Sequence, residues 1–196
     1  MVHHEPSRAG RTDEQGFSLI EIMIVLVLIG LVSSMAVPVS SYLLQQSKAD
    51  SASVFASTAL DSARDQAVAQ RRNIVLTFMM PNRLRLDRQD INTVGVVTGT
   101  TALATYTLEA GQEFMLFPGQ QDTPDGFGAG DSIAFSGTGP FMFTSDGSLV
   151  DSNGDISNGT IFLANPEQPD TARAITVFGV TGLTRTWKWR GLKWME

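Results

Sequence analysis

Hydrophobic and polar positions divide this chain into one long helical stretch followed by many short strands. From Phe17 to Val37 the residues are apolar or small, with a single charge at Glu21. A run of about twenty apolar residues is the length that a helix needs to cross a bilayer. In lipid a helix is enforced, because every backbone N–H and C=O must be paired within the segment. The pattern therefore predicts a transmembrane helix over residues 17–37.

The helical pattern continues beyond this run as an amphipathic stripe of small residues. The apolar positions recur at spacings of three and four, at Ala52, Ala56, Leu60, Ala63 and Ala67. Pro38 is expected to bend the helix, because proline removes one hydrogen bond and clashes with the preceding turn. We predict one helix over residues 17–71, whose alanine-rich second half packs closely on a sheet.

Short segments rich in β-branched and large apolar residues follow, separated by Gly, Pro, Asn and Asp turns. This pattern predicts an α+β fold, in which the long N-terminal helix packs on an antiparallel sheet, or two sheets, formed by residues 72–196. Strands are expected at 73–80, 83–87, 93–97, 104–108, 113–117, 132–135, 140–144, 159–164, 174–178 and 183–189, with loops at 119–130 and 165–171.

Composition argues against an enzyme. The chain has no cysteine, and its two histidines, His3 and His4, both lie within the first sixteen residues. A Ser-His or Cys-His catalytic arrangement is therefore excluded from residue 17 onward. No glycine-rich segment has the lysine of a phosphate-binding loop, and we expect no cofactor.

Basic residues are unevenly placed around the apolar run. Arg8 and Arg11 precede it, and the first basic residue after it is Lys48. Under the positive-inside rule this distribution indicates a cytoplasmic N-terminus and a domain on the opposite side of the membrane. The net charge of −6 opposes non-specific nucleic-acid binding except by a local patch.

The residues around the start of the apolar run are not those of a plain anchor or a secretory signal. An intramembrane acid costs roughly 2.5–3.5 kcal/mol, and a secretory signal has a shorter apolar core with a small-residue cleavage site. The hexapeptide Gly16-Phe17-Ser18-Leu19-Ile20-Glu21 resembles the cleavage and methylation motif of type IV prepilins and pseudopilins.

This resemblance implies that residues 1–16 are a leader, which a prepilin peptidase removes by cutting between Gly16 and Phe17. The same enzyme would methylate the new amine of Phe17. Glu21 would then pair with the N-terminal amine of a neighbouring subunit, since a buried carboxylate is tolerable only when paired. Gly30 and Pro38 stand where the family has a mid-helix glycine and a proline.

The resemblance also implies the partners and location of the protein. Other pilins or pseudopilins would bind through the N-terminal helix, first in the inner membrane and then in a type IV pilus or a type II secretion pseudopilus. The segment 63–71 and the C-terminal strand are similar to GspH/FimT-type minor pilins. That group commonly has Gly-Arg-x-Arg near the C-terminus, whereas this chain has Gly182-Leu183-Thr184-Arg185, so the first arginine is missing.

Basic residues alternate with tryptophan near the C-terminus. Two interpretations are open for Arg185, Lys188, Arg190 and Lys193. In the first, the tryptophans on one face of the strand join the core, while Lys188 and Arg190 on the other face lie in solvent or contact a neighbouring subunit. In the second, the basic and aromatic side chains bind DNA by phosphate contact and base stacking.

An Asp-Ser-Asn-Gly-Asp segment raises the question of a calcium site. Asp151, Asn153 and Asp155 follow the odd-position spacing of an EF-hand loop. However, the twelfth position is Phe162 in place of the expected glutamate, and Gly154 comes one residue early. A turn held by the Asp and Asn side chains between two strands is the alternative, and we expect no metal.

Overall fold

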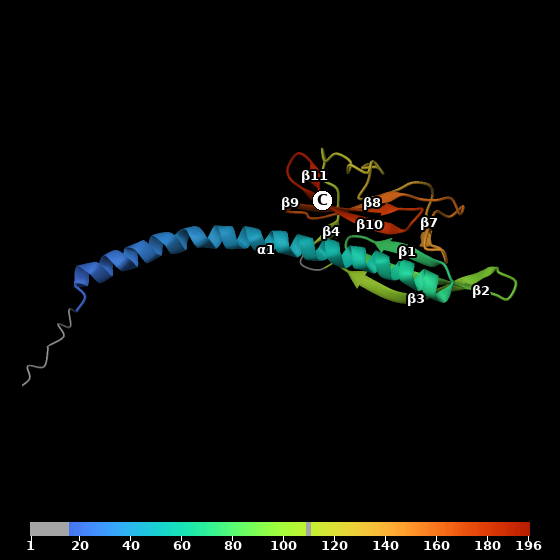
Figure 1. Cartoon of the computed structure of the whole chain (residues 1–196), viewed down its shortest axis with the longest axis horizontal. Helices are drawn as coiled ribbons and strands as arrows, with labels where there is room; N and C mark the ends of the chain where they lie inside the picture. Colours follow the sequence, from blue (N-terminus) through green and yellow to red (C-terminus); the bar gives the residue numbers. More distant parts are fainter. Residues whose placement is uncertain (1–15, 109–110) are drawn as a thin grey trace, which may run out of the picture. The chain divides into compact units, whose positions relative to one another are not determined.

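The computed structural model describes residues 16–108 and 111–196, and for residues 35–41 it describes the backbone alone. Its first element is helix α1, Leu19–Gln70, drawn in blue to green in Figure 1. This agrees with the predicted helix over 17–71. The backbone is helical through Pro38, and the bend expected there stays a prediction. All of the predicted leader except Gly16 lies outside the described residues.

The chain divides after Tyr42 into two compact units, Met1–Tyr42 and Leu43–Glu196. The second unit contains the later part of α1 and all of the strands. Within the residues that the structure describes, no helix combines the length and the apolarity needed to cross a membrane.

The first sheet has five antiparallel strands in the order β3-β2-β1-β6-β7. Consecutive strands β1, β2 and β3 form a meander, so the long strand β3 occupies one edge of this sheet. The strands are β1 (Ile74–Met79), β2 (Arg83–Ile91), β3 (Val97–Thr107), β6 (Phe141–Phe143) and β7 (Leu149–Val150).

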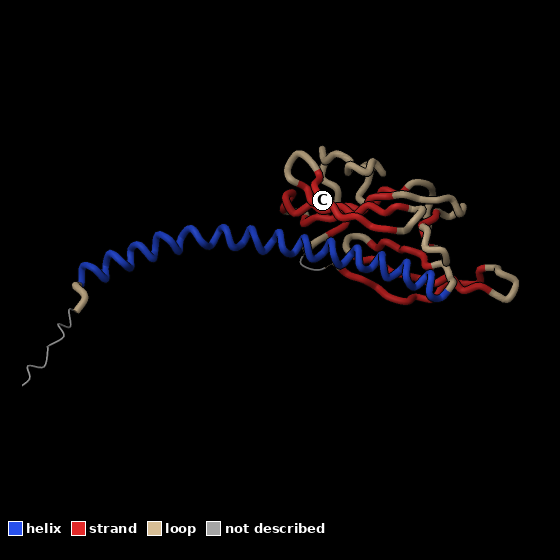
Figure 2. Tube along the Cα trace, in the orientation of Figure 1, coloured by secondary structure: helices blue, strands red, loops and turns tan. Residues whose placement is uncertain are grey.

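The second sheet is also antiparallel, in the order β11-β10-β9-β8-β4, with β5 paired to β8 as well. Figure 2 shows the strands of the two sheets in red beside the later part of α1. The strands are β4 (Glu113–Phe114), β5 (Ile133–Phe135), β8 (Gly159–Asn165), β9 (Gln168–Phe178), β10 (Leu183–Trp189) and β11 (Trp194–Met195).

The main core lies between α1 and both sheets. All five residues of the predicted helical stripe are buried, and Leu60 is fully so. They pack against Leu86 of the first sheet and Ile161 and Ile175 of the second, among others. Alanine at most of these helix positions lets the backbone approach the strands closely, which confirms the prediction that the stripe packs on a sheet.

A second, smaller core lies on the other face of the second sheet. Along β8, Ile161 and Leu163 belong to the main core, whereas Phe162 and Ala164 belong to the second. This is the period-two alternation of a strand buried on both faces. The three tryptophans cover this second cluster, and they are Trp187, Trp189 and Trp194.

Several expected strand boundaries are wrong, and side-chain hydrogen bonds explain two of the errors. The expected strand at 93–97 is mostly a turn, because the Asn92 side chain accepts hydrogen bonds from the N–H groups of Val94 and Val96. The expected loop at 165–171 is a hairpin, in which the Asn165 side chain accepts from the N–H of Glu167 and β9 already begins at Gln168. β2 is longer than expected and β4 shorter.

Candidate functional site

The start of α1 places an acid beside the N-terminal end of the helix. Backbone N–H groups of Glu21 and Ile22 donate to the Ser18 carbonyl oxygen at 3.0 and 3.2 Å. Ser18 is therefore at the N-cap, and Glu21 comes three residues later, which is the spacing of a capping box. The partial positive charge of the helix N-terminus also favours an acid in the first turn. The Ser-x-x-Glu spacing in the sequence is the local signal that could have predicted this helix start.

The helix that follows exposes an apolar surface on all sides. Every large apolar side chain from Leu19 to Val32 is exposed, with fractions from 47% at Val25 to 77% at Leu19. At Gly30, an added Cβ would have no atom of the chain within 4 Å. An exposed apolar surface of this extent marks contact with a membrane or another protein.

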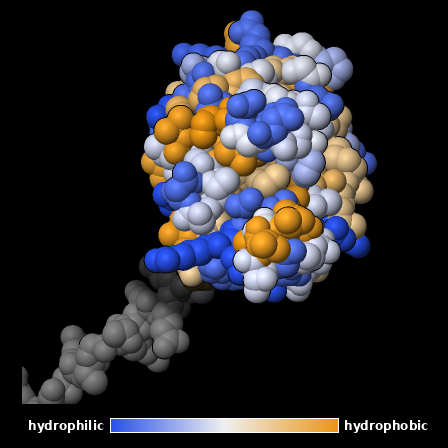
Figure 3. Space-filling model, turned by 90° about the vertical axis from the view of Figure 1, so that its right-hand side faces the viewer, coloured by the Kyte–Doolittle hydropathy of each residue, from blue (hydrophilic) through white to orange (hydrophobic). Residues whose placement is uncertain are grey.

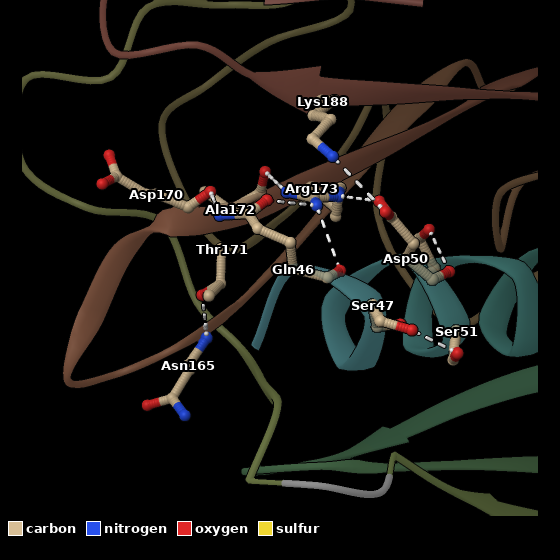
Figure 4. Close-up of polar contacts among 11 residues, drawn as sticks. Gln46, Ser47, Asp50, Ser51, Asn165, Asp170, Thr171, Ala172, Arg173 and Lys188 are labelled. Carbon is tan, nitrogen blue, oxygen red and sulfur yellow. Dashed lines mark hydrogen bonds and ion pairs between the residues drawn. The ribbon is translucent and has the colours of Figure 1, made fainter. Parts of the chain in front are cut away.

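In the second unit, a polar cluster formed by Gln46, Asp50, Arg173 and Lys188 joins α1 to the second sheet (Figure 4). Arg173 of β9 is 2% exposed, and its Nε lies 2.7 Å from Asp50 Oδ1. Its Nη2 donates to Gln46 Oε1 at 2.9 Å, and its Nη1 donates to the Ala172 carbonyl oxygen at 3.0 Å. The buried guanidinium is thus paired and hydrogen-bonded, as a buried charge must be.

Asp50 serves two cations at once. Arg173 and Lys188 are register partners on β9 and β10, and Lys188 Nζ lies 3.3 Å from the second carboxylate oxygen of Asp50. Burial acts to raise the pKa of Asp50, but the hydrogen bond and charge of Arg173, reinforced by Lys188, hold that pKa below its usual value. One ionised carboxylate therefore balances two neighbouring positive charges at the helix–sheet contact.

The four basic residues proposed for a C-terminal binding surface are in different environments. Arg185 Nη1 lies 2.7 Å from Asp125 Oδ1, and its guanidinium stacks over the Phe178 ring at 5.2 Å. Lys188 contacts α1 through Asp50, so the expectation that it lies in solvent is wrong. Only the other two, Arg190 and Lys193, are exposed. DNA binding by this region stays a prediction, with two of its four cations paired within the domain.

The tryptophans are structural. Trp187, Trp189 and Trp194 are each 8% exposed or less. For Trp187 and Trp189 this agrees with the first of the two interpretations, in which the tryptophan face of the strand joins the core. Trp189 and Trp194 pack edge to face with ring centroids 5.0 Å apart, and Trp194 Nε1 donates to the Gln121 carbonyl oxygen at 2.7 Å. Buried rings are not free to stack on the bases of a nucleic acid.

With this geometry established, comparison with known proteins gives one family match. Residues 11–37 match the model of the prokaryotic N-terminal methylation motif. The chain is type IV pilin-like at its N-terminus. The matched segment contains the predicted cleavage position and Glu21, and it ends one residue before Pro38. No curated protein matches the chain.

Two solved structures are similar to this pilin-like chain, both of the type IV minor pilin FimU from Pseudomonas aeruginosa. The crystal structure in space group P21 is 16% identical, covers 81% of this chain and 98% of its own, and gives a TM-score of 0.44. The structure in space group P65 is also 16% identical, covers 77% and 97%, and gives a TM-score of 0.41. The more specific resemblance to GspH/FimT-type subunits stays a prediction.

The segment considered for calcium forms a turn around one carboxylate. Asp151 Oδ1 accepts from the backbone N–H of Asn153 at 2.8 Å and of Asp155 at 3.0 Å, and Oδ2 accepts from that of Thr138 at 3.2 Å. Burial acts to raise the pKa of Asp151, but these N–H donors hold it below its usual value. Among the described residues there is no cluster of three His, Cys, Asp or Glu side chains suited to a metal ion.

The turn between β6 and β7 depends on an ionised aspartate. Asp146 accepts hydrogen bonds from the Thr144 hydroxyl and from the N–H and hydroxyl of Ser148. These bonds, with that of Thr144 the strongest, lower the pKa of Asp146 from 3.8 to about 2. A carboxyl group whose pKa is lower in the folded chain stabilises the fold at every pH above its pKa in the unfolded chain. This stabilisation is lost as the pH falls through the pKa of the folded chain.

We therefore expect Asp146→Asn to be less stable than the wild type at about pH 6. The difference should shrink between pH 3.8 and about 2 and be absent below that range. Urea unfolding of both proteins at a series of pH values measures it. An equal difference at every pH would contradict a role for the ionised form.

Proposed function

We propose that this protein is a minor pilin or pseudopilin, a structural subunit of a type IV pilus or a type II secretion pseudopilus. A prepilin peptidase removes residues 1–16 and methylates the amine of Phe17. The helix over residues 17–37 first anchors the protein in the inner membrane, with the domain in the periplasm, and then carries it into the filament. The match of residues 11–37 to the N-terminal methylation motif carries this proposal.

The chemistry of the exposed helix supports assembly. In lipid or among other apolar helices, the surface from Leu19 to Val32 is removed from water, which is favourable in proportion to its area. Glu21 is the one charge in this segment, and it gains by pairing with a cationic N-terminal amine of a neighbour. The open surface at Gly30 would allow close approach of a second helix, because small residues let helix backbones pack tightly.

The substitution Glu21→Ala tests the assembly step. We expect cleavage and methylation to proceed normally. Incorporation into filaments should fall by about tenfold or more, because a loss of about 1.4 kcal/mol in the free energy of assembly already lowers the equilibrium constant tenfold. Quantitative immunoblotting of sheared filaments against whole cells measures incorporation, and the mobility of the processed band reports cleavage. Glu21→Gln, which keeps the shape and removes the charge, should behave in the same way.

Ser34→Ala is the matched control in the same helix. The Ser34 hydroxyl donates to the Leu31 carbonyl oxygen of its own helix, so this variant should assemble at wild-type levels. Wild-type incorporation of Glu21→Ala would refute the proposed pairing with a neighbouring amine. Co-purification with the major pilin or with secretion pseudopilins then tells which filament contains the protein.

A further inference from the structure

The edge of the first sheet is a long strand with unusual properties. β3 runs from Val97 to Thr107 and, among the described residues, pairs only with β2. Figure 1 shows the β2–β3 hairpin extending away from the other strands. Alternate residues of an edge strand direct their backbone N–H and C=O groups outward, where they can pair with another strand. The other strands at sheet edges in the described residues are short: β4, β7 and β11 have two residues each, and β5, which pairs with β8, has three.

Natural edge strands are protected by charges, prolines, bulges or short length. From Ile91 to Leu108 the sequence contains no charged residue and no proline. β3 does contain two irregularities, where its register against β2 shifts between Ala104 and Ala102 and between Gly99 and Val97. The part of β3 that is both regular and exposed at every residue is therefore Gly99–Ala102, and new strand pairing would be centred there.

The charges beside this segment are already balanced. On β2, Arg85 lies 2.9 Å from Asp87 and Arg88 lies 2.9 Å from Asp90. Thr101 Oγ1 in turn donates to Asp90 Oδ2 at 2.6 Å. The edge and the part of β2 from Arg85 to Asp90 therefore present no net charge, while Arg83 at the start of β2 adds one positive charge, and the whole chain has a net charge of −6.

We propose that β3 pairs in antiparallel fashion with β3 of a second copy of this chain, which joins the two edges into one sheet. Self-pairing fits the absence of charge, because a two-fold axis brings the segment against its own copy, so any net charge on the segment would face the same net charge. A different partner strand would impose no such requirement. Figure 3 views the domain from the hairpin end and shows apolar patches there, and the exposed Val94, Val96 and Val97 of the hairpin tip add apolar surface beside the pairing segment.

Symmetry fixes the register closely. In an antiparallel pair related by a two-fold axis, one residue lies directly opposite its own copy. Within Gly99–Ala102 the central candidates are the two threonines, and the hydroxyl of Thr101 is already donated to Asp90. We therefore place Thr100 opposite Thr100 of the second copy. Thr101 then lies opposite Gly99 and on the other face of the sheet.

Single-cysteine variants test this register, because the natural chain has no cysteine. The full-length Thr100→Cys protein is expressed in cells, and the isolated membranes are oxidised. A disulfide-linked dimer should then be seen on a non-reducing gel. A disulfide requires Cα atoms about 4.4–6.8 Å apart, so Thr101→Cys on the neighbouring position should give at least about fivefold less dimer. Ser145→Cys, exposed in the β6–β7 turn, measures random collision.

The outcomes separate cleanly. Dimer from Thr100→Cys well above both controls supports the pairing. Three results would each overturn it. The first is a dimer yield from Thr100→Cys no higher than that from Ser145→Cys, the second is a higher yield from Thr101→Cys, and the third is a cross-link only to another protein. Processing of the Thr100→Cys chain to the mature length serves as the check that the variant folds and reaches the membrane.

Discussion

Replacing Asp50 with alanine is expected to lower the free energy of unfolding by about 3 kcal/mol. The substitution leaves the guanidinium of Arg173 buried without its carboxylate and beside Lys188, another cation. A buried charge that loses its partner is far more costly than a lost surface pair. Urea unfolding of the full-length protein in detergent, followed by tryptophan fluorescence, measures the change, because all three tryptophans lie in the second sheet.

Three further variants separate this effect from the general loss of a surface charge. Arg173→Met should cost less than Asp50→Ala, about 1–2 kcal/mol, because the remaining Asp50 side chain is 52% exposed and keeps its hydration. Adding Arg173→Met to Asp50→Ala should therefore recover stability. Asp65→Ala on the exposed face of α1, whose nearest cation is 3.8 Å away, should change stability by less than about 0.5 kcal/mol. Equal losses for Asp50→Ala and Asp65→Ala would contradict the role of the polar cluster.

The second large effect is expected at Gly182, which we predict to cost about 3 kcal/mol or more when replaced with alanine. Gly182 has a φ of +64°, where a side chain is strained, and its Cβ would overlap the carbonyl oxygen of Gly147. It would also lie 2.8 Å from Cδ of Arg64, which is itself held by a 2.9 Å hydrogen bond to the Thr181 carbonyl oxygen. The turn after β9 would have to move away from α1.

Gly191→Ala is the matched control. Gly191 has a φ of +78°, but no atom lies within 4 Å of its added Cβ. This variant should lose only the conformational term of about 1 kcal/mol. The difference between the two variants then measures the close approach at Gly182. A Gly182→Ala protein as stable as Gly191→Ala would show that the Gly147 turn can move at little cost.

Much of the fold could be predicted from local pattern. The alanine stripe on α1, the period-two character of β10 and the apolar tryptophan face all follow from spacings within one element, and the structure confirms them. Burial of a small-residue stripe is decided by the helix period alone, so no knowledge of the partner strands is needed.

The polar cluster could not be predicted in this way. Asp50 and Arg173 are 123 positions apart in the chain, and neither has a local pattern that signals the other. Arg173 immediately precedes the expected strand 174–178, so the sequence places it at a strand end. In the structure β9 begins at Gln168, and Arg173 lies within the strand. Similarly, Val94 and Val96 have high strand propensity, but the Asn92 side chain holds them in a turn. The pairing of Asp50 with Arg173 depends on a tertiary contact, and the turn at Val94 and Val96 depends on a side-chain cap, so neither follows from local propensity.

The N-terminal segment differs from the polar cluster, because the features used to predict its role lie in consecutive residues. Ser18 and Glu21 stand at helix-capping spacing, and the apolar residues that follow are exposed on the isolated chain. Folding of the domain does not require them to be apolar. Their chemistry is explained by what surrounds the helix, which we propose to be first lipid and then neighbouring helices.

Mass spectrometry of the mature N-terminus tests this claim most directly. The protein is purified from cells that contain a prepilin peptidase, and the N-terminal peptide is sequenced by fragmentation. We expect the chain to begin at Phe17 with one methyl group on its amine. A chain that retains its first sixteen residues in those cells would contradict the proposed processing, and with it the proposed route into a filament.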